Sequence, residues 1–173
     1  MFRSKWTAVI LLAASAFAGS AITAVGALGD QGHGRRGHRQ DTTRIVLHTS
    51  LAPSIPSDPT LLGSAPGGLP WALRSGEASL RSNGRMQASI RGLVIPVAPF
   101  TGTAGPVTTV TASLYCGGNS TPVGTSAPVP ISTHGNAYIS AKFTLPAKCL
   151  IPALLIHPNG AASVYIASSG FSG

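Results

Sequence analysis

The chain has 173 residues, of which 43% are hydrophobic and 9% are charged. This balance supplies enough apolar material for the core of one domain and excludes a wholly disordered chain. The formal net charge of +8, together with 21 glycines and 14 prolines, indicates a basic protein built from strands and turns rather than helices.

The first 29 residues have the pattern of an export signal. Arg3 and Lys5 form a short basic start, and residues 7–29 contain no charge. Small residues from Ala18 onward offer sites for a signal peptidase, so residues 1–29 are predicted to be a signal peptide. The alternative is an uncleaved N-terminal anchor, because the uncharged stretch is long enough to span a bilayer. Both interpretations predict a secreted, extracellular protein or one associated with the cell envelope.

Residues 30–41 are rich in Gly, Arg and His and contain no apolar residue. We therefore expect a basic, flexible spacer. Its arginines, Arg35, Arg36 and Arg39, are candidate contacts for an anionic wall polymer or for lipid headgroups. The alternatives are a solvated linker and a weak metal site at His33 and His38.

Residues 42–173 are predicted to form one all-β domain. Apolar and polar residues alternate through 86–91, 109–116 and 137–145, which predicts strands with one buried face. Short strands separated by turn residues at this spacing indicate an immunoglobulin-like antiparallel β-sandwich of about seven to eight strands. The strands are expected near residues 43–50, 71–81, 85–95, 106–116, 123–132, 137–145, 149–157 and 161–168.

The turn at 82–84 fixes the register of one predicted hairpin, because a shift of one residue would turn apolar side chains outward. A three-residue loop with Gly84 in the left-handed conformation pairs Leu80 with Met86. A two-residue loop would pair Leu80 with Gln87, so we expect the three-residue loop.

A second hairpin is predicted at Asn159-Gly160, which is a typical two-residue turn. This loop would pair Leu155 with Val164 and so bring apolar residues together on one face. It predicts that the last strand returns directly beside the strand before it.

The chain contains two cysteines, Cys116 and Cys149. In an exported protein they are expected to form a disulfide, since each lies at the end of a predicted strand face that points inward. A redox pair would need the close Cys-x-x-Cys spacing, and a metal site would need more ligands than are visible.

No catalytic or cofactor motif is found, so we predict no catalytic residue, no metal site and no cofactor. Only two carboxylates, Asp58 and Glu77, follow residue 44, and a paired-carboxylate glycosidase is therefore not expected. A metal site at His48, His134 and His157 is the alternative to their interpretation as histidines at strand ends and turns.

The basic residues of the domain are dispersed without interleaved aromatics, so no nucleic-acid partner is expected. Arg81 and Arg85 are predicted to lie opposite each other beside the first hairpin loop. Such a like-charge pair is mildly destabilising, which makes it a candidate anion contact, with two solvated arginines as the alternative. Glu77 is expected to form a surface ion pair with Arg91, and Trp71 to fill the core rather than stack on a sugar.

Five segments of the domain carry a resemblance to known proteins: Gly68-Leu-Pro-Trp71, Gly92-Leu-Val-Ile-Pro96, Thr103 to Cys116, Leu145-Pro-Ala-Lys-Cys149 and Ile156-His-Pro-Asn-Gly160. In these segments the chain resembles secreted proteins of actinobacteria and related soil bacteria for which no activity is known. The resemblance covers roughly residues 50–170 and excludes the spacer. It implies a secreted all-β domain in which the two cysteines belong to the shared pattern.

The sequence therefore predicts an exported, non-catalytic binding or structural module. Its expected partner is an anionic cell-wall polymer, lipid headgroups or another envelope protein. The alternative is a secreted hydrolase or metal-dependent enzyme on the same scaffold, because a fold does not fix a function. A cleft that gathers histidines with Asp58 would favour the enzyme, whereas a closed surface with an apolar patch would favour the binding module.

Overall fold

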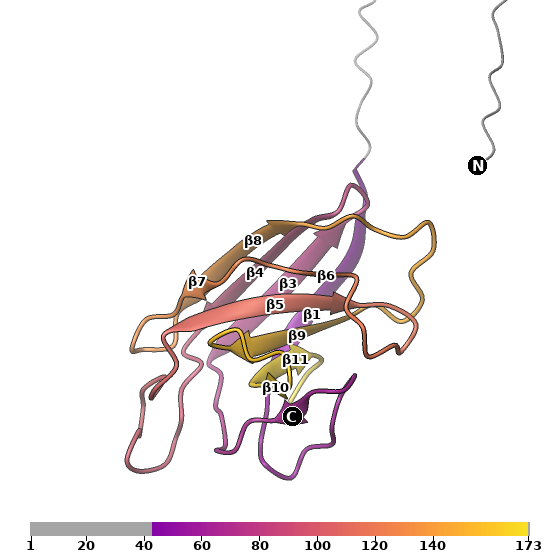
Figure 1. Cartoon of the computed structure of the whole chain (residues 1–173). Coiled ribbons are helices and arrows are strands. Elements are labelled where there is room, and N and C mark those ends of the chain that lie inside the picture. The colour runs from indigo at the N-terminus through magenta and orange to yellow at the C-terminus, as the bar shows by residue number, and fades with distance from the viewer. Residues whose placement is uncertain (1–42, 173) are drawn as a thin grey trace, which may run out of the picture. The chain divides into compact units, whose positions relative to one another are not determined.

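The structure, a computed structural model, describes residues 43–172, and these form strands and loops without a helix (Figure 1). The predicted signal peptide at 1–29 and the spacer at 30–41 lie outside the described residues. Residues 43–172 contain no helix that could cross a membrane. The strands are β1 (Ile45–Pro53), β2 (Ala65–Pro66), β3 (Ser75–Arg81), β4 (Arg85–Arg91), β5 (Thr109–Tyr115), β6 (Gly124–Thr125), β7 (Val129–Pro130), β8 (Ala137–Lys142), β9 (Ala153–Pro158), β10 (Val164–Tyr165) and β11 (Ala167–Ser169).

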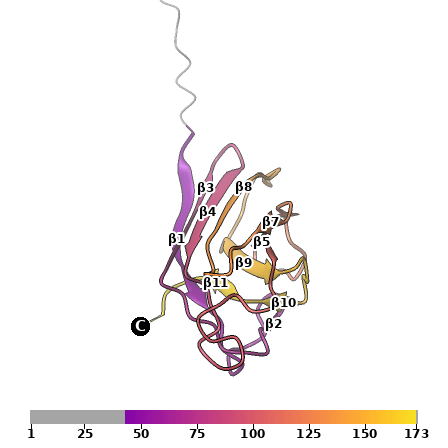
Figure 2. The ribbon, with the colours of Figure 1, turned by 90° about the vertical axis from the view of Figure 1, so that its left-hand side faces the viewer.

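Strand β1 belongs to both halves of the main sheet. Its first part pairs with β3, where Ser50 lies opposite Glu77, and its last part pairs with β11, where Leu51 lies opposite Ser169. The hydrogen-bonded order is β6-β5-β9-β11-β1-β3-β4-β8, and β7 also pairs with β5. Figure 2 shows the sheet curled so that β3, β4 and β8 face β5 and β9. The main sheet is thus an antiparallel half-barrel.

The predicted all-β, antiparallel architecture is confirmed, but the strands are shorter and more numerous than expected. The single strand expected at 123–132 divides into β6 and β7. Pro122 precedes this segment, and Pro128 and Pro130 lie within it; proline cannot donate a hydrogen bond to a strand ladder. The strand expected at 161–168 also divides, because β10 leaves the main sheet and pairs in parallel with β2.

The first predicted hairpin is confirmed. Leu80 lies opposite Met86 and Ala78 opposite Ala88. Gly84 has a φ of 83°, and its N–H donates to the Arg81 carbonyl over 2.8 Å. The three-residue loop therefore sets a register of β3 and β4 in which the apolar residues of both strands face the core, as the alternation of apolar and polar residues predicted.

The register predicted for the second hairpin is wrong. Asn159-Gly160 has the left-handed backbone of the expected turn, with φ values of 48° and 73°. However, Leu155 pairs with Ser168 rather than with Val164. Val164 is held by β2 instead, so the chain returns to β9 only with β11. The displacement is an even number of residues, which leaves the same side chains facing the core.

The main core fills the space inside the curled sheet. Trp71 is 6% exposed and belongs to it, which confirms its predicted position. The inward side chains of the strands supply most of the rest, namely Ala78, Leu80, Met86, Ala88, Ile90, Val110, Ala112, Leu114, Ile139, Leu154 and Ile156.

Strand β5 is buried on both faces, although its alternation predicted one solvent-facing side. Thr111 and Ser113 are 5% and 1% exposed. A second apolar cluster of Tyr115, Leu155 and Tyr165 covers this side and packs against Leu61 and Leu62 from the 54–73 segment. The hydroxyl of Ser113 is satisfied by that of Thr125 at 2.8 Å, as burial of a polar group requires. The 54–73 segment therefore covers the side that the sequence pattern left open.

The predicted disulfide between Cys116 and Cys149 is confirmed. Cys116 directly follows β5, and Cys149 lies shortly before β9, the strand that pairs with β5. The Cα atoms are 5.1 Å apart, within the range that a disulfide spans. The bond therefore links the end of β5 to the chain just before β9, and these two strands are the middle pair in the order β6-β5-β9-β11.

Alanine at Gly135 is expected to destabilise the fold more than alanine at Gly102. Both glycines have left-handed backbones, with φ values of 72° and 76°. That conformation alone costs a residue with a Cβ about 1–2 kcal/mol. At Gly135 a Cβ would also overlap the backbone of Leu93, whereas nothing lies within 4 Å of it at Gly102. Urea denaturation measures both losses, and equal losses would contradict the close packing at Leu93.

Replacing both cysteines by serine is expected to lower the free energy of unfolding by about 3–4 kcal/mol, because the bond closes a 33-residue separation in the unfolded chain. Denaturation of the Cys116→Ser/Cys149→Ser variant tests this value. Reduced wild-type protein is the control and should behave like the variant. A loss below about 1 kcal/mol would show that the bond adds little to stability.

Candidate functional site

One side of the sheet, made of β1, β3, β4 and β8, presents a polar face to solvent. Alternate residues of these strands point into the core, so the residues between them point outward. Cross-strand pairing aligns the outward residues in rows, for example Glu77, Ser89 and Tyr138. We call this surface the outer face; its side chains are His48, Ser50, Ser75, Glu77, Ser79, Arg81, Arg85, Gln87, Ser89, Arg91, Tyr138, Ser140 and Lys142.

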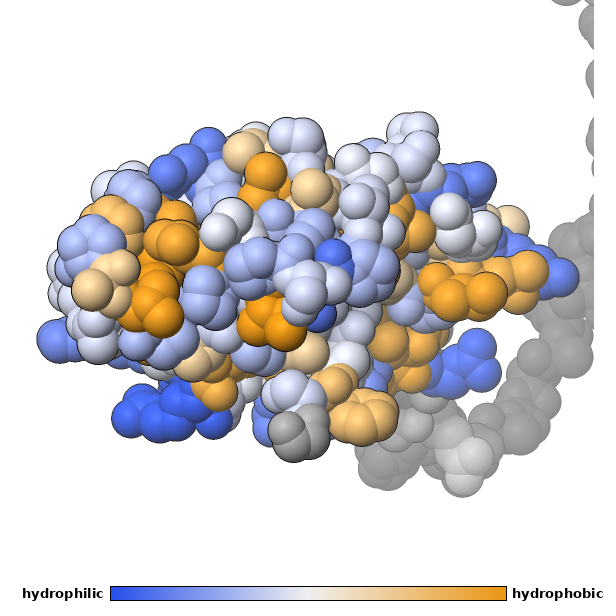
Figure 3. All heavy atoms as spheres, turned by 90° about the horizontal axis from the view of Figure 1, so that it is seen from below, coloured by the Kyte–Doolittle hydropathy of each residue, from blue (hydrophilic) through white to orange (hydrophobic). Residues whose placement is uncertain are grey.

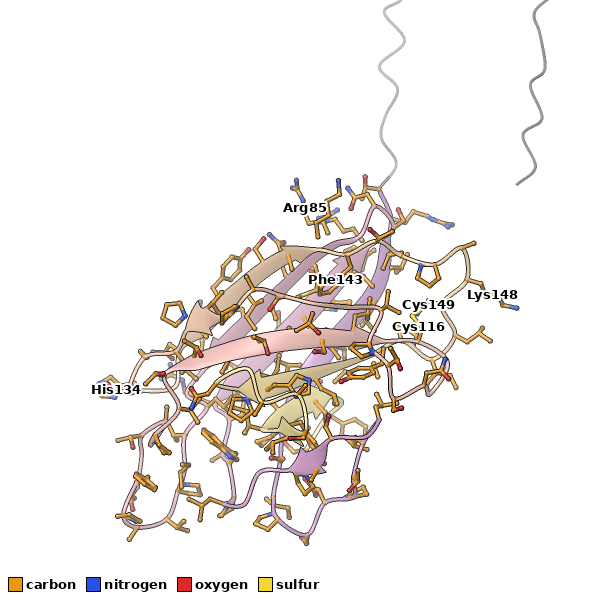
Figure 4. All side chains as sticks on the ribbon, in the orientation of Figure 1. Arg85, Cys116, His134, Phe143, Lys148 and Cys149 are labelled. Carbon is orange, nitrogen blue, oxygen red and sulfur yellow. A yellow bond between two sulfur atoms is a disulfide. The ribbon has the colours of Figure 1, made fainter. Side chains whose placement is uncertain are left out.

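One end of the outer face carries a row of cations. The pairing of Leu80 with Met86 places Arg81 opposite Arg85 at the next position, and Arg85 lies opposite Lys142. The two arginines predicted as anion contacts are therefore brought together and joined by a lysine. Arg85 projects from the end of the sheet at which β1 begins (Figure 4). We call this row the cationic end.

Arg44 adds a fourth positive charge near the cationic end. Its N–H donates to the Ser82 hydroxyl over 3.1 Å, and its carbonyl accepts from the Ser82 N–H over 2.7 Å. These two hydrogen bonds fix the chain just before β1 to the turn between β3 and β4. The spacer arginines, Arg35, Arg36 and Arg39, lie outside the described residues.

The carboxylates of the domain do not neutralise the cationic end. Residues 43–172 contain seven lysines and arginines but only two carboxylates, Asp58 and Glu77. Asp58 accepts a hydrogen bond from the Ile55 N–H over 2.9 Å in the loop after β1. Glu77 lies four residues along β3 from Arg81, which corresponds to about 13 Å. The positive charge therefore remains available to an anionic partner.

A hollow of about 670 Å³ lies toward the opposite end of the outer face, lined by residues of β4, β7 and the start of β8 together with Arg74. Tyr138 is 57% exposed at this hollow. Arg74 and Arg91, both exposed, lie along the same hollow with Asn136. We call it the Tyr138 groove. It combines an exposed aromatic ring with two positive charges.

The expected ion pair between Glu77 and Arg91 is not formed as a direct contact in the described structure. The two residues are on the same face and diagonal to each other, as predicted. They line a smaller hollow of about 230 Å³ together with Ser75, Gly76 and Ser89. Glu77 therefore keeps its carboxylate free to accept hydrogen bonds from a ligand.

The alternative three-histidine metal site does not assemble. His48 is exposed on the outer face, His134 is exposed in the turn before β8, and His157 is buried in β9. Figure 4 shows His134 at the far end of the sheet from Arg85. Among residues 43–172 there is no group of three or more His, Cys, Asp or Glu side chains placed to hold a metal ion.

His157 is buried and neutral. Its Nδ1 donates to the Val164 carbonyl over 2.7 Å, and its Nε2 has no hydrogen-bond partner. Burial lowers the pKa of His157 below its ordinary value of 6.5, and the hydrogen bond to Val164 only partly opposes this shift. Burial, followed by the charge of Asp58, raises the pKa of Tyr165, whose hydroxyl donates to the Pro59 carbonyl. The hydrogen bond of His157 therefore holds β10 against β9, and that of Tyr165 holds the loop after β1.

Apolar side chains also reach the surface near the disulfide. Leu150 and Ile151 are 55% and 79% exposed. Viewed from below, however, apolar side chains form separate patches divided by polar ones (Figure 3). In this view the apolar surface is therefore interrupted rather than continuous.

The sequence did not single out Lys142, Arg44 or Tyr138 as site residues. Lys142 and Tyr138 alternate with inward residues in the predicted strand 137–145, so their outward direction was available from the pattern. Their position beside β4 could not be predicted from the pattern, because the pairing of β4 with β8 joins segments about 50 residues apart. No signal in the local sequence identifies that pairing.

No protein-family model matches the chain, and neither the curated proteins nor the solved structures contain a significant match to it.

The domain is expected to lose stability as the pH falls below about 6.5, because unfolded His157 takes up a proton more readily than the buried folded form. The stability is present above the unfolded pKa and is lost progressively as the pH approaches the lowered folded pKa. His157→Asn keeps a donor for Val164 but cannot titrate, so this part of the pH dependence should disappear. Urea denaturation between pH 7.5 and pH 4.5 measures it.

His48→Asn is the control, since His48 is exposed on the outer face. It should leave the pH dependence of unfolding as in the wild type. An unchanged pH dependence in His157→Asn would show that His157 does not cause the loss.

Proposed function

We propose that this protein is an exported, non-catalytic binding module that holds an anionic polymer of the cell envelope on its outer face. The domain is proposed to be a variant of the immunoglobulin-like sandwich in which β1 joins the two sides. The disulfide supports export, since such bonds persist in oxidising compartments. We also propose that it is related to the secreted proteins of actinobacteria and related soil bacteria that its sequence resembles.

The cationic end carries this proposal. Arg81, Arg85 and Lys142 lie side by side across three strands, although like charges in opposed positions destabilise a sheet. Arg85 and Lys142 are exposed and Arg81 is half-buried, so an anionic polymer could reach all three. The repulsion between these three cations destabilises the folded domain, and a bound anion would offset that repulsion. This is the behaviour expected of an anion-binding site.

The carboxylates do not favour the enzyme alternative. Asp58 closes a turn after β1, whereas Glu77 lies in the middle of the outer face. A hydrolase that used both as acid and base would need them on either side of one bond. Lipid headgroups and another envelope protein remain the competing partners. A comparison of polymer binding with vesicle binding distinguishes the polymer from lipid headgroups.

Substitution of Arg85 by Gln in the full chain is expected to weaken binding to poly(glycerol phosphate) several-fold and to reduce the salt dependence of binding. Lys148→Gln is the matched control, because it removes one exposed positive charge away from the outer face. It should change the affinity by less than about twofold. Binding is measured by sedimentation or calorimetry at low and high salt, with phosphatidylglycerol vesicles as a second ligand.

The same Arg85→Gln variant should unfold at an equal or slightly higher urea concentration, since repulsion from Arg81 and Lys142 is relieved. Equal weakening by Arg85→Gln and Lys148→Gln would contradict a role for the cationic end. No binding of the wild type at low salt to either of these ligands or to an acidic polysaccharide would contradict the proposed function. Binding to vesicles alone would assign the site to lipid.

A further inference from the structure

The Tyr138 groove has a chemistry that the cationic end does not explain. An anion contact needs only positive charge, but this hollow also holds an aromatic side chain, the polar side chains of Ser89 and Asn136, and apolar residues of β4, β7 and β8. Tyr115 and Tyr165 are 2% and 1% exposed, whereas Tyr138 is 57% exposed. The exposed tyrosine is therefore not needed to fill the core.

The ring of Tyr138 is held in a fixed position on the sheet. Gln87 Nε2 donates a hydrogen bond to the Tyr138 hydroxyl over 2.7 Å. Gln87 is on β4, diagonal to Tyr138, since Tyr138 lies opposite Ser89 and Gln87 opposite Ser140. This hydrogen bond directs the side chain of Tyr138 from β8 towards β4, and the side chain remains 57% exposed. A ring fixed before binding loses little freedom when a ligand stacks on it.

The end of the groove is also fixed by hydrogen bonds. The N–H of Arg74 donates to the Gly92 carbonyl over 3.3 Å, and the N–H of Gly92 donates to Asn136 Oδ1 over 3.0 Å. These contacts tie together the chain before β3, after β4 and before β8. These contacts fix the backbone that carries Arg74 and Arg91. Both arginines lie at the end of the groove that is farther from the cationic end.

The rest of the outer face offers groups that pair with hydroxyls. Each hydroxyl group of a bound ligand needs a hydrogen-bond partner to replace water. Serines, Gln87, His48 and Glu77 provide such partners in rows between the Tyr138 groove and the cationic end. The rows follow one another along the strands and extend over about 20 Å.

These features favour an acidic sugar polymer over the other anionic ligands. A flat aromatic ring stacks on the apolar face of a sugar ring, hydroxyl and amide side chains bind its hydroxyls, and arginine binds a carboxylate in a two-pronged geometry. A phospholipid surface would need only the positive charges and would leave the tethered ring of Tyr138 without a role. Single-stranded nucleic acid prefers several stacking aromatics in succession, whereas among residues 43–172 Tyr138 is the one aromatic ring on the strands of this face, with Phe171 at its edge.

We propose, building on the proposed function, that the outer face binds a polysaccharide of uronic-acid type, with a sugar ring stacked on Tyr138 and its carboxylate bound by Arg91 or Arg74. The polymer then runs along the hydroxyl-bearing rows to the cationic end. Charge complementarity supports this occupant, because five positive charges and one carboxylate line this path. They are Arg74, Arg81, Arg85, Arg91, Lys142 and Glu77.

The test is binding of the full chain to polygalacturonate, with uncharged dextran as the comparison ligand. Tyr138→Ala should weaken binding about tenfold or more, since it removes the stacking contact. Tyr138→Phe keeps the ring but loses the hydrogen bond to Gln87, so its affinity should lie between those of Tyr138→Ala and the wild type. Leu150→Ala is the control, because Leu150 is 55% exposed near the disulfide and lies outside both the groove and the outer face. Arg91→Gln should weaken binding to polygalacturonate and leave dextran unbound.

The outcomes separate this inference from the proposed function. An affinity for polygalacturonate that Tyr138→Ala leaves unchanged, but Arg85→Gln lowers, overturns the inference and keeps the binding module. Binding to poly(glycerol phosphate) or to an oligonucleotide in place of polygalacturonate also overturns it. Failure to bind any of these anions overturns both. Tyr138 is exposed, so an unchanged urea midpoint for Tyr138→Ala shows that a loss of binding is not a loss of folding.

Discussion

The division of the hydrogen bonds of β1 between β3 and β11 determines the shape of the domain. The first part of β1 extends one side of the sheet, and its last three residues extend the other. Leu51, at the point of change, is 5% exposed and lies in the core. Because one strand cannot follow two directions without bending the sheet, the two sides curl over each other and enclose the apolar side chains.

This curl covers the two sides unequally. Strands β5 and β9 are buried on both faces, because the 54–73 segment and β10 close over them. Strands β3, β4 and β8 are buried only on their inner faces, as the strict alternation of buried and outward residues in β3 and β4 indicates. The domain consequently has one broad strand surface free for a ligand, and its polar and charged residues gather on that surface.

The free surface contributes little to the stability of the fold. Among residues 43–172 its cations have no carboxylate partner, and its tyrosine is bound to a neighbouring side chain rather than packed in the core. Stability comes instead from the inner faces of the strands and from the disulfide that joins the ends of β5 and β9. Residues of the outer face can therefore be selected for binding, since the fold does not depend on their mutual attraction.

The sequence by itself determined the strand class, the three-residue turn at Gly84 and the pairing of Cys116 with Cys149. Each of these follows from local alternation, from turn chemistry or from a count of cysteines. The return of β11 beside β9, the burial of Thr111 and Ser113, and the junction of Lys142 and Tyr138 with β4 were decided by the tertiary structure alone. They depend on contacts between segments far apart in the chain, such as β2 with β10 and β4 with β8, and local patterns carry no information about which distant strand will supply the hydrogen bonds.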